Sequence, residues 1–377
     1  MVYCQSCQKK FKWYSFEKSL IRENDLLLTK SSGSSLHIGK TTLADAYFEE
    51  HECYYSNFLQ RLSLKRTVFP KLYWYIFNSI FVREQFVYLQ NSTSGIGNIN
   101  SDNINNVIVP TLPYDMQQKI VAILDVKCEE IDKLIANQQG QIDKLKEYKQ
   151  SVITEAVTKG LDPSVPMKDS GVEWIGSIPE EWKISSVKSL FNIISGATPK
   201  SDIQEYWDGD IIWVTPSDFK TEDVFISQGK RNISLKGLKS CSTTMVPINS
   251  IIFSKRAPIG LVAINKNELC TNQGCLSCVN IFEQNIKYFY YVMSICTEQF
   301  NLLGSGTTFK EISATKFSLF SLPQPSVAEQ QQIADYLDDK CGKIDQLIAI
   351  KQQKIDKLQQ YKKSLIYEYV TGKKEVV

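Results

Sequence analysis

Residues 110–158 read PTLPYDMQQKIVAILDVKCEEIDKLIANQQGQIDKLKEYKQSVITEAVT, and residues 323–371 read PQPSVAEQQQIADYLDDKCGKIDQLIAIKQQKIDKLQQYKKSLIYEYVT. The two stretches align without a gap, and about half of their positions are identical. An internal repeat of this length predicts two copies of one structural element in a single chain.

Apolar residues recur in both stretches at alternating steps of three and four, which is typical of a helix that buries one stripe of side chains against another helix. This stripe, the seam, consists of Leu124, Cys128, Ile131, Ile135, Ile142, Leu145 and Val152 in the first stretch and Leu337, Cys341, Ile344, Ile348, Ile355, Leu358 and Leu365 in the second. Polar residues interrupt it at matching places, a feature that can fix register. Two helices of roughly 60 Å in one chain favour an intramolecular antiparallel coiled coil over pairing between chains.

The ends of the two stretches carry helix signals. Ser326 followed by Glu329 has the spacing of a capping box, and Gly160 and Gly372 follow the last turns. The sequence therefore predicts a module at residues 1–109, a spacer helix at 110–160, a linker at 161–171, a second module at 172–322 and a second spacer helix at 323–377.

The two modules are similar to each other. Residues 25–30 (DLLLTK) match 250–255 (SIIFSK), and residues 73–79 (YWYIFNS) match 288–294 (YFYYVMS). Each module combines short β-branched runs, separated by turn signals, with one aromatic helix, at 71–86 and at 286–300. We therefore expect an α+β fold in which two β-rich, mixed modules alternate with two spacer helices in a pseudo-twofold arrangement.

The modules differ in length. Roughly 80 residues of the second module precede residues 250–255, whereas only roughly 24 precede residues 25–30. The front third to half of the first module is therefore expected to be missing.

Composition narrows the class of protein. The length of 377 residues argues for more than one folded part. The net charge of +2 argues against a strongly basic tail. Ten scattered cysteines without a secretion signal indicate free thiols in a reducing cytoplasm. No apolar run is long enough to span a membrane. The two CxxC pairs, Cys4/Cys7 and Cys275/Cys278, lie too far apart in sequence to indicate one zinc site.

Catalytic motifs are missing from the sequence. His37 and His51 are the only histidines, so the sequence does not indicate a catalytic site built on histidine. Asp218 and Lys220 have the acid-x-Lys spacing of metal-dependent nucleases, but a second placed carboxylate is lacking. There is no glycine-rich S-adenosylmethionine loop and no Asn-Pro-Pro-aromatic motif. The chain is interpreted as a binding protein with no catalytic, cofactor or metal site.

Several basic and hydroxyl side chains are candidates for DNA contacts, because lysine, arginine and hydroxyl groups bind phosphates and arginine also reads guanine. In the second module they are Ser195, Thr198, Lys200, Lys230, Arg231, Lys236, Lys239, Lys255 and Arg256, and in the first Lys30, Lys40, Arg61, Lys65 and Arg66. Charge is roughly balanced in each module, so the same residues also fit an ordinary solvated surface.

The combination of motifs resembles the DNA-specificity subunit of type I restriction-modification systems. The resemblance is carried by the two repeated stretches and by residues 169–184 (DSGVEWIGSIPEEWKI), 194–200 (ISGATPK), 213–219 (WVTPSDF), 254–260 (SKRAPIG) and 329–348 (EQQQIADYLDDKCGKIDQLI). It covers about residues 20–377.

This resemblance implies that each module is a target-recognition domain reading one half of a split site in double-stranded DNA. It also implies that the spacer helices set the distance between the half-sites. The implied partners are two methyltransferase subunits, which use S-adenosylmethionine, and two motor-nuclease subunits, which use ATP and magnesium; this chain itself has no active site. Two alternatives remain open, a self-contained restriction-methylation enzyme and a coiled-coil adaptor without a role on DNA.

Overall fold

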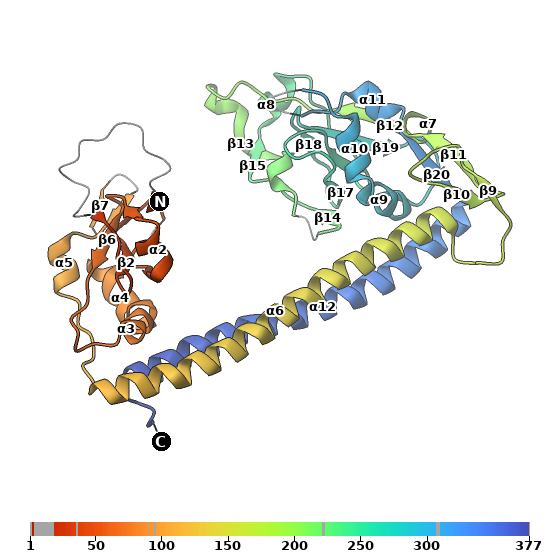
Figure 1. Ribbon diagram of the computed structural model, residues 1–377. Coiled ribbons are helices and arrows are strands. Elements are labelled where there is room, and N and C mark those ends of the chain that lie inside the picture. The colour runs from red at the N-terminus through yellow and green to blue at the C-terminus, as the bar shows by residue number, and fades with distance from the viewer. Residues whose placement is uncertain are drawn as a thin grey trace. The chain divides into compact units, whose positions relative to one another are not determined.

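The chain folds into two compact units in a computed structural model that describes residues 2–3, 19–34, 37–89, 91–93, 96–220, 223–306 and 310–376 (Figure 1). The first unit comprises Met1–Ile142 and Ile350–Val377, and the second comprises Asp143–Ala349. Two long helices, α6 (Tyr114–Lys159) and α12 (Val327–Val370), contribute to both units. The chain is of the mixed α+β class, as its sequence predicts.

The first unit contains short strands and helices ahead of α6. In chain order they are β1 (Val2–Tyr3), β2 (Leu26–Thr29), β3 (Ser31–Ser32), β4 (Thr41–Leu43), α2 (Ala46–Glu50), β5 (Tyr54–Tyr55), β6 (Leu59–Leu62), α3 (Pro70–Asn78), α4 (Ile80–Leu89), β7 (Asn91–Thr93), β8 (Ile96–Asn98) and α5 (Ser101–Asn105). Strands β4-β2-β6 and β3-β8-β7 form two antiparallel sheets, and β1 pairs with β5.

The second unit is larger and richer in strands. Between α6 and α12 it contains β9 (Met167–Asp169), β10 (Ser177–Pro179), β11 (Lys183–Ser186), α7 (Val187–Leu190), β12 (Phe191–Ser195), η3 (Gln204–Tyr206), β13 (Trp207–Val214), η4 (Pro216–Asp218), β14 (Phe225–Ile226), β15 (Arg231–Ile233), α8 (Leu235–Lys239), β16 (Ile251–Ser254), β17 (Val262–Asn265), β18 (Cys270–Thr271), β19 (Cys275–Asn280), α9 (Ile286–Ser294), α10 (Thr297–Leu303), α11 (Ala314–Ser318) and β20 (Ser321–Gln324). Its main sheet has the order β12-β19-β16-β17-β14, and a second sheet has the order β15-β13-β18. Both sheets mix parallel and antiparallel neighbours.

The expected similarity of the modules is visible in strand pairing. Strand β2 pairs on one side with β4 and on the other with β6, and β16 pairs in the same way with β17 and β19. Leu27 lies opposite Arg61, and Ile252 lies opposite Ser277. Residues 25–30 and 250–255 therefore occupy equivalent places, as predicted from their sequences.

The prediction of one continuous aromatic helix in each module was wrong. The first run divides into α3 and α4 because the backbone at Ser79 is extended (ψ 156°) and the Ser79 hydroxyl donates to the Ile76 carbonyl at 2.6 Å. The second divides into α9 and α10 at Cys296. The expected linker at 161–171 also contains a strand, since β9 pairs with β10.

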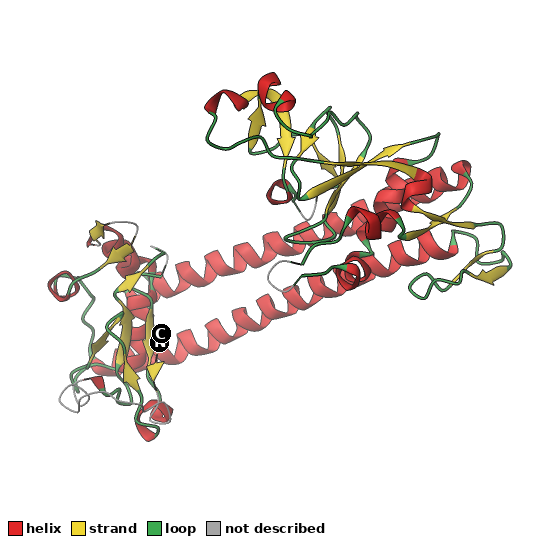
Figure 2. Cartoon of the chain, turned by 90° about the horizontal axis from the view of Figure 1, so that it is seen from above, coloured by secondary structure: helices red, strands yellow, loops and turns green. Residues whose placement is uncertain are grey.

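Helices α6 and α12 lie side by side and run in opposite directions within each unit (Figures 1 and 2). In the first unit, Lys362 Nζ lies 2.6 Å from Asp132 Oδ2, and Lys351 donates to Gln141. In the second unit, Lys149 Nζ lies 2.7 Å from Asp345 Oδ2. As the residue number rises along α6 it falls along α12, as required of antiparallel helices.

The hydrophobic core of each unit joins its globular part to the long helices. In the first unit, Leu26, Tyr75 and Ile76 pack in one cluster with Leu124 and Leu365. In the second, Phe253 and Tyr291 pack in one cluster with Val152 and Leu337. All fourteen seam residues are buried or half-buried. No helix among the described residues has the length and apolar character needed to cross a lipid bilayer.

The glycines that end both helices are present as predicted, whereas the expected capping box at Ser326 is present only in part. Glu329 N donates to Ser326 Oγ at 3.3 Å, and the Glu329 carboxylate accepts a bond from Trp182 Nε1 at 2.9 Å, which ties the start of α12 to the second module. Gly160 and Gly372 follow α6 and α12 with φ of +76° and +70°, a left-handed conformation that favours glycine.

Candidate nucleic-acid interface

Two loops of the second unit that carry family-like motifs meet at a hollow of about 450 Å3. One loop follows β13, and the other follows β16. This second-unit hollow is lined by Thr215, Pro216, Ser217, Arg256, Ala257, Asn272 and Gly274. Hydroxyl, amide and guanidinium groups therefore face one open concave surface, a chemistry suited to phosphates and base edges.

The loop after β13 is held rigid by Asp218. This carboxylate accepts bonds from Thr215 N at 2.8 Å, from Thr215 Oγ1 at 2.8 Å and from Lys230 N at 3.1 Å. Lys230 Nζ also donates to the Ser217 carbonyl at 2.9 Å. These hydrogen bonds account for the aspartate at position 218 without a metal ion. No cluster of potential metal ligands occurs among the described residues.

The loop after β16 is anchored by Glu311. Lys255 Nζ lies 2.7 Å from Glu311 Oε1, and Arg256 Nη1 lies 3.3 Å from Glu311 Oε2. The hydrogen bond from Lys255, with added attraction from both cations, holds the pKa of Glu311 below its ordinary value. The Lys255 side chain is only 15% exposed, whereas Arg256 is 35% exposed and lines the hollow. Of the two candidates, Arg256 is the better placed for a ligand.

A third loop, after β12, lies against the same region. Gly196 is required there because a Cβ atom would overlap the Thr271 and Asn272 carbonyl oxygens. Next to it, Ala197 N donates to the Thr271 carbonyl at 3.0 Å, and the Thr198 hydroxyl bonds to the Gln273 side chain. The candidate Thr198 is therefore connected to the turn that contributes Asn272 and Gly274.

The other candidates of the second module do not line this hollow. The Arg231 guanidinium lies 3.9 Å from the centre of the Trp207 ring, a cation–π arrangement. Lys236 pairs with Glu205 at 2.7 Å on the exposed surface. Ser195, Lys200 and Lys239 are exposed, and the Lys200 carbonyl accepts a bond from Trp207 Nε1 at 3.1 Å.

Three candidates of the first module gather at another hollow. Arg61, Lys65 and Arg66 line a space of about 550 Å3, the first-unit hollow, together with Arg22 and Tyr114. Lys30 and Lys40 lie outside it. Sequence reasoning missed Arg22 because it lies in the turn before β2, far in sequence from residues 61–66.

Sequence reasoning also missed Thr215, Ser217 and Asn272 at the second-unit hollow. The sequence did contain one indication of this site, the polar turn TPSD within residues 213–219. Its Thr215 and Asp218 form a capping box, which fixes the loop that lines the hollow. The cysteines indicate no site there: burial raises the pKa values of Cys275 and Cys278, while Cys4 and Cys7 lie outside the described residues.

The known proteins that resemble this chain in sequence share one function. Residues 179–360 match the family model of the type I restriction modification DNA specificity domain. The MjaIX type I restriction enzyme specificity subunit of Methanocaldococcus jannaschii is 40% identical over 171 residues, which are 44% of this chain and 40% of that protein. The MjaVIII specificity subunit of the same organism is 25% identical over 380 residues, covering 97% of this chain and 82% of that protein.

A solved structure has the same fold. A chain from work on complex assembly and conformational transition of the type I R-M system superimposes with a TM-score of 0.72 over 93% of this chain and 82% of that one, at 15% identity. The matched family segment contains the second-unit hollow and most of α12. Residues 179–360 are therefore similar to the type I restriction-modification DNA specificity domain, and the chain has the fold of a protein from such a system.

Proposed function

We propose that this chain is the non-catalytic subunit that gives a type I restriction-modification complex its DNA sequence specificity. The single observation that carries the proposal is that two of the family-like motifs, residues 213–219 and 254–260, form one polar hollow in the unit matched by the family model. A surface of fixed hydroxyl, amide and guanidinium groups suits the direct readout of DNA.

The two units serve as readers of a bipartite target. Equivalent strand pairing around β2 and β16 supports a common origin of the two globular parts. The sheet around β2 has three strands among the described residues, and the sheet around β16 has five. We therefore expect the first reader, with the boundaries 1–109, to contact its half-site over a smaller surface than the second reader, residues 172–322.

Helices α6 and α12 form an antiparallel coiled coil that sets the distance between the half-sites. Support comes from the burial of the seam residues and from the ion pairs Asp132–Lys362 and Lys149–Asp345, which recur at equivalent positions of the repeat. Such pairs fix partner and register more than they add stability. Half-site spacing then follows from helix length, as it does in other proteins that hold two readers apart.

The partners of the complex are two methyltransferase subunits and two motor-nuclease subunits, and double-stranded DNA is the ligand. S-adenosylmethionine, ATP and magnesium bind to those partner subunits. The hydrogen bonds that occupy Asp218 support a binding role rather than metal-dependent catalysis by this chain.

Co-expression tests this function. A host carrying this chain and its methyltransferase partner should contain methylated adenines in one bipartite motif, and the methyltransferase alone should leave that motif unmodified. Methylation by the purified chain alone would instead support a self-contained methylation enzyme. A lack of any effect on methylation or duplex binding would support an adaptor without a role on DNA.

A further inference from the structure

The first-unit hollow carries a group of positive charges. Arg22, Arg61, Lys65 and Arg66 line its space of about 550 Å3, against two acidic residues, Glu23 and Asp25. An excess of cations on a concave surface attracts anions more strongly than the same charges on a flat surface. Some of these charges are neutralised by acidic groups of the protein itself, and only the others can attract a ligand.

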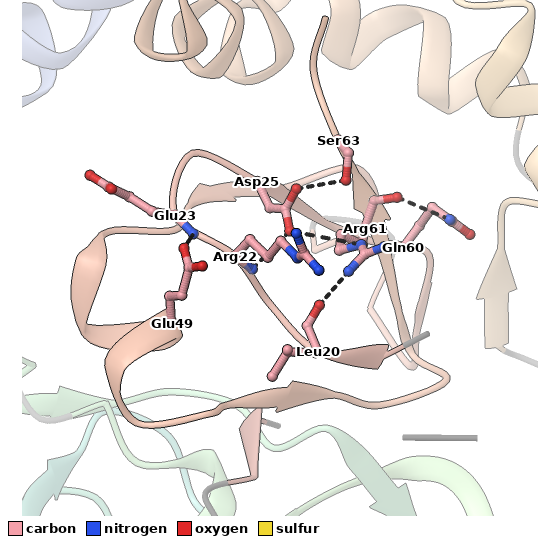
Figure 3. Close-up of polar contacts among 8 residues, drawn as sticks. All are labelled: Leu20, Arg22, Glu23, Asp25, Glu49, Gln60, Arg61 and Ser63. Atoms are coloured by element: carbon pink, nitrogen blue, oxygen red, sulfur yellow. Dashed lines mark hydrogen bonds and ion pairs between the residues drawn. The ribbon is translucent and has the colours of Figure 1, made fainter. Parts of the chain in front are cut away.

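Asp25 is the buried acid of the hollow, and its carboxylate is fully engaged (Figure 3). It accepts bonds from Arg22 N at 2.9 Å and from Ser63 Oγ at 2.7 Å, and it lies 3.7 Å from Arg61 Nε. The Arg61 side chain also donates to the Leu20 carbonyl. Arg61 is therefore fixed and its charge is compensated by Asp25.

The remaining cations are not compensated in this way. Arg22, Lys65 and Arg66 are exposed and form no salt bridge within the described part of the chain. Arg22 precedes a turn in which Asn24 has a φ of +66°, and Asn24 N donates to the Ala44 carbonyl at 2.9 Å, so the turn is well defined. Three cations against the single carboxylate of Glu23 leave the hollow with a net positive charge.

Uncharged residues occupy the places of Asp25 and Arg61 in the second unit. Ser250 occupies the place of Asp25, and its hydroxyl donates to the Pro247 carbonyl at 2.8 Å. Ser277 occupies the place of Arg61, opposite Ile252 in the sheet, and is completely buried. The strand pairing around β16 therefore forms without a charged pair at these two places, so the pairing itself does not require Asp25 and Arg61.

We propose that the first-unit hollow binds a phosphate group. Arginine and lysine side chains that line one concave surface match the charge of a phosphate, and arginine can bond two of its oxygens at once. In the complex the phosphate belongs to the DNA backbone, so the first unit contacts the backbone of its half-site at this hollow. The choice of DNA as the source rests on the function proposed above, whereas the phosphate chemistry does not.

The test compares two double variants of the full chain. Lys65→Gln/Arg66→Gln removes two charges from the hollow without touching the Asp25–Arg61 pair. Lys183→Gln/Lys188→Gln removes two exposed charges from the second unit and is the matched control. Circular dichroism checks that both variants fold like the unmodified chain.

The first arm measures the affinity for a 30-base-pair duplex as a function of salt concentration by fluorescence anisotropy. The hollow variant should lose about tenfold in affinity at 0.1 M salt, and its log–log salt slope should fall by about 1–2 because each lost phosphate contact contributes about 0.9. The control should change less than twofold. Equal losses in both variants would mean general attraction to a charged surface, and would overturn the DNA contact.

The second arm titrates the full chain with inorganic phosphate by calorimetry at constant ionic strength. Binding that is lost in the hollow variant and kept in the control supports the phosphate site, even if the chain fails to bind duplex DNA and the proposed function fails. Phosphate binding with unchanged DNA affinity would assign the hollow to a free phosphate and refute the DNA source. No effect of the hollow variant in either arm would overturn the proposal.

Discussion

Tyr75 donates a hydrogen bond from its hydroxyl to Asp125 Oδ1 at 2.8 Å, joining α3 to α6. Lys71 Nζ lies 2.7 Å from the other oxygen of the same carboxylate. In the second unit, Tyr291 bonds to Asp338 Oδ1 at 2.8 Å, and Lys287 bonds to the other oxygen. Asp125 and Asp338 occupy equivalent positions of the repeated stretch, so one lysine–tyrosine–aspartate set attaches each globular part to a long helix.

Replacing Tyr75 or Tyr291 by phenylalanine should destabilise the chain by about 1 kcal/mol, because each change removes one hydrogen bond to a partly exposed carboxylate. Burial, followed by the bond to aspartate, raises the pKa of both tyrosines, so the hydroxyl is protonated and donates at neutral pH. Urea denaturation provides the measurement. Tyr361→Phe is the control, because Tyr361 is 54% exposed and its hydroxyl should contribute within 0.5 kcal/mol. Equal effects at buried and exposed tyrosines would contradict this attachment.

Truncating the seam should be costly in both long helices. Leu124 and Leu337 are equivalent and completely buried, and Leu→Ala at either should cost about 2–5 kcal/mol through lost burial and a remaining cavity. The matched controls lie on the same helices: Leu134 and Leu347 are equivalent to each other and are 50% and 48% exposed. Leu→Ala there should change the free energy of unfolding by less than about 0.5 kcal/mol. Similar costs at the four positions would argue against the seam.

Glu311 should make the second unit sensitive to acid. Because its pKa is lowered in the folded chain, its ion pairs stabilise the fold above the ordinary glutamate pKa, and this contribution is lost as the pH falls through the lowered value. Glu311→Gln should therefore lower Tm at pH 7, and the difference from the unmodified chain should shrink as the pH is lowered below the ordinary glutamate pKa. Glu283→Gln, at an exposed position of the same unit, is the control. A difference that stays constant with pH would disprove the ionic role of Glu311.

The cysteines should differ strongly in reactivity. Burial raises the pKa of Cys341 to about 11 and that of Cys270 to about 12, so little thiolate forms at pH 8. Cys241 is half-buried and more accessible. Iodoacetamide followed by mass spectrometry should therefore modify Cys241 first among the cysteines of the described ranges. Labelling of Cys341 at the same rate in the folded chain would show that the seam opens readily.

The long helices, the paired strands around β2 and β16, and the helix ends were predictable because each depends on local periodicity or on a nearby turn residue. The residue-by-residue correspondence between the aromatic helices of the two modules was not predictable from the sequence. Sequence similarity aligned Tyr73 with Tyr288 and Tyr75 with Tyr290. The hydroxyls of Tyr73 and Tyr288 do donate to equivalent carbonyls, those of Pro110 and Pro323. The hydrogen bonds to Asp125 and Asp338, however, pair Tyr75 with Tyr291. The two alignments differ by one residue, and neighbouring aromatic residues fit both, so the partner of each tyrosine could be identified only in the structure.

The two hollows were predictable only in part. Basic residues could be selected by type, which found Arg256 and Arg61. Their environment depends on residues distant in sequence, since Glu311 pairs with Arg256 and Asp25 pairs with Arg61. No local pattern reveals such pairs, so residues held by the fold could not be separated from residues open to a ligand before the structure was known.

Exchange of the second reader shows whether each reader recognises its own half-site. Residues 172–322 would be replaced by the corresponding domain of a specificity subunit with a different known target, and methylated adenines would be mapped in cells that also carry the methyltransferase partner. One half of the methylated motif should change to the donor's half-site, while the other half and the spacing remain. An unchanged motif, or a change in both halves, would contradict it.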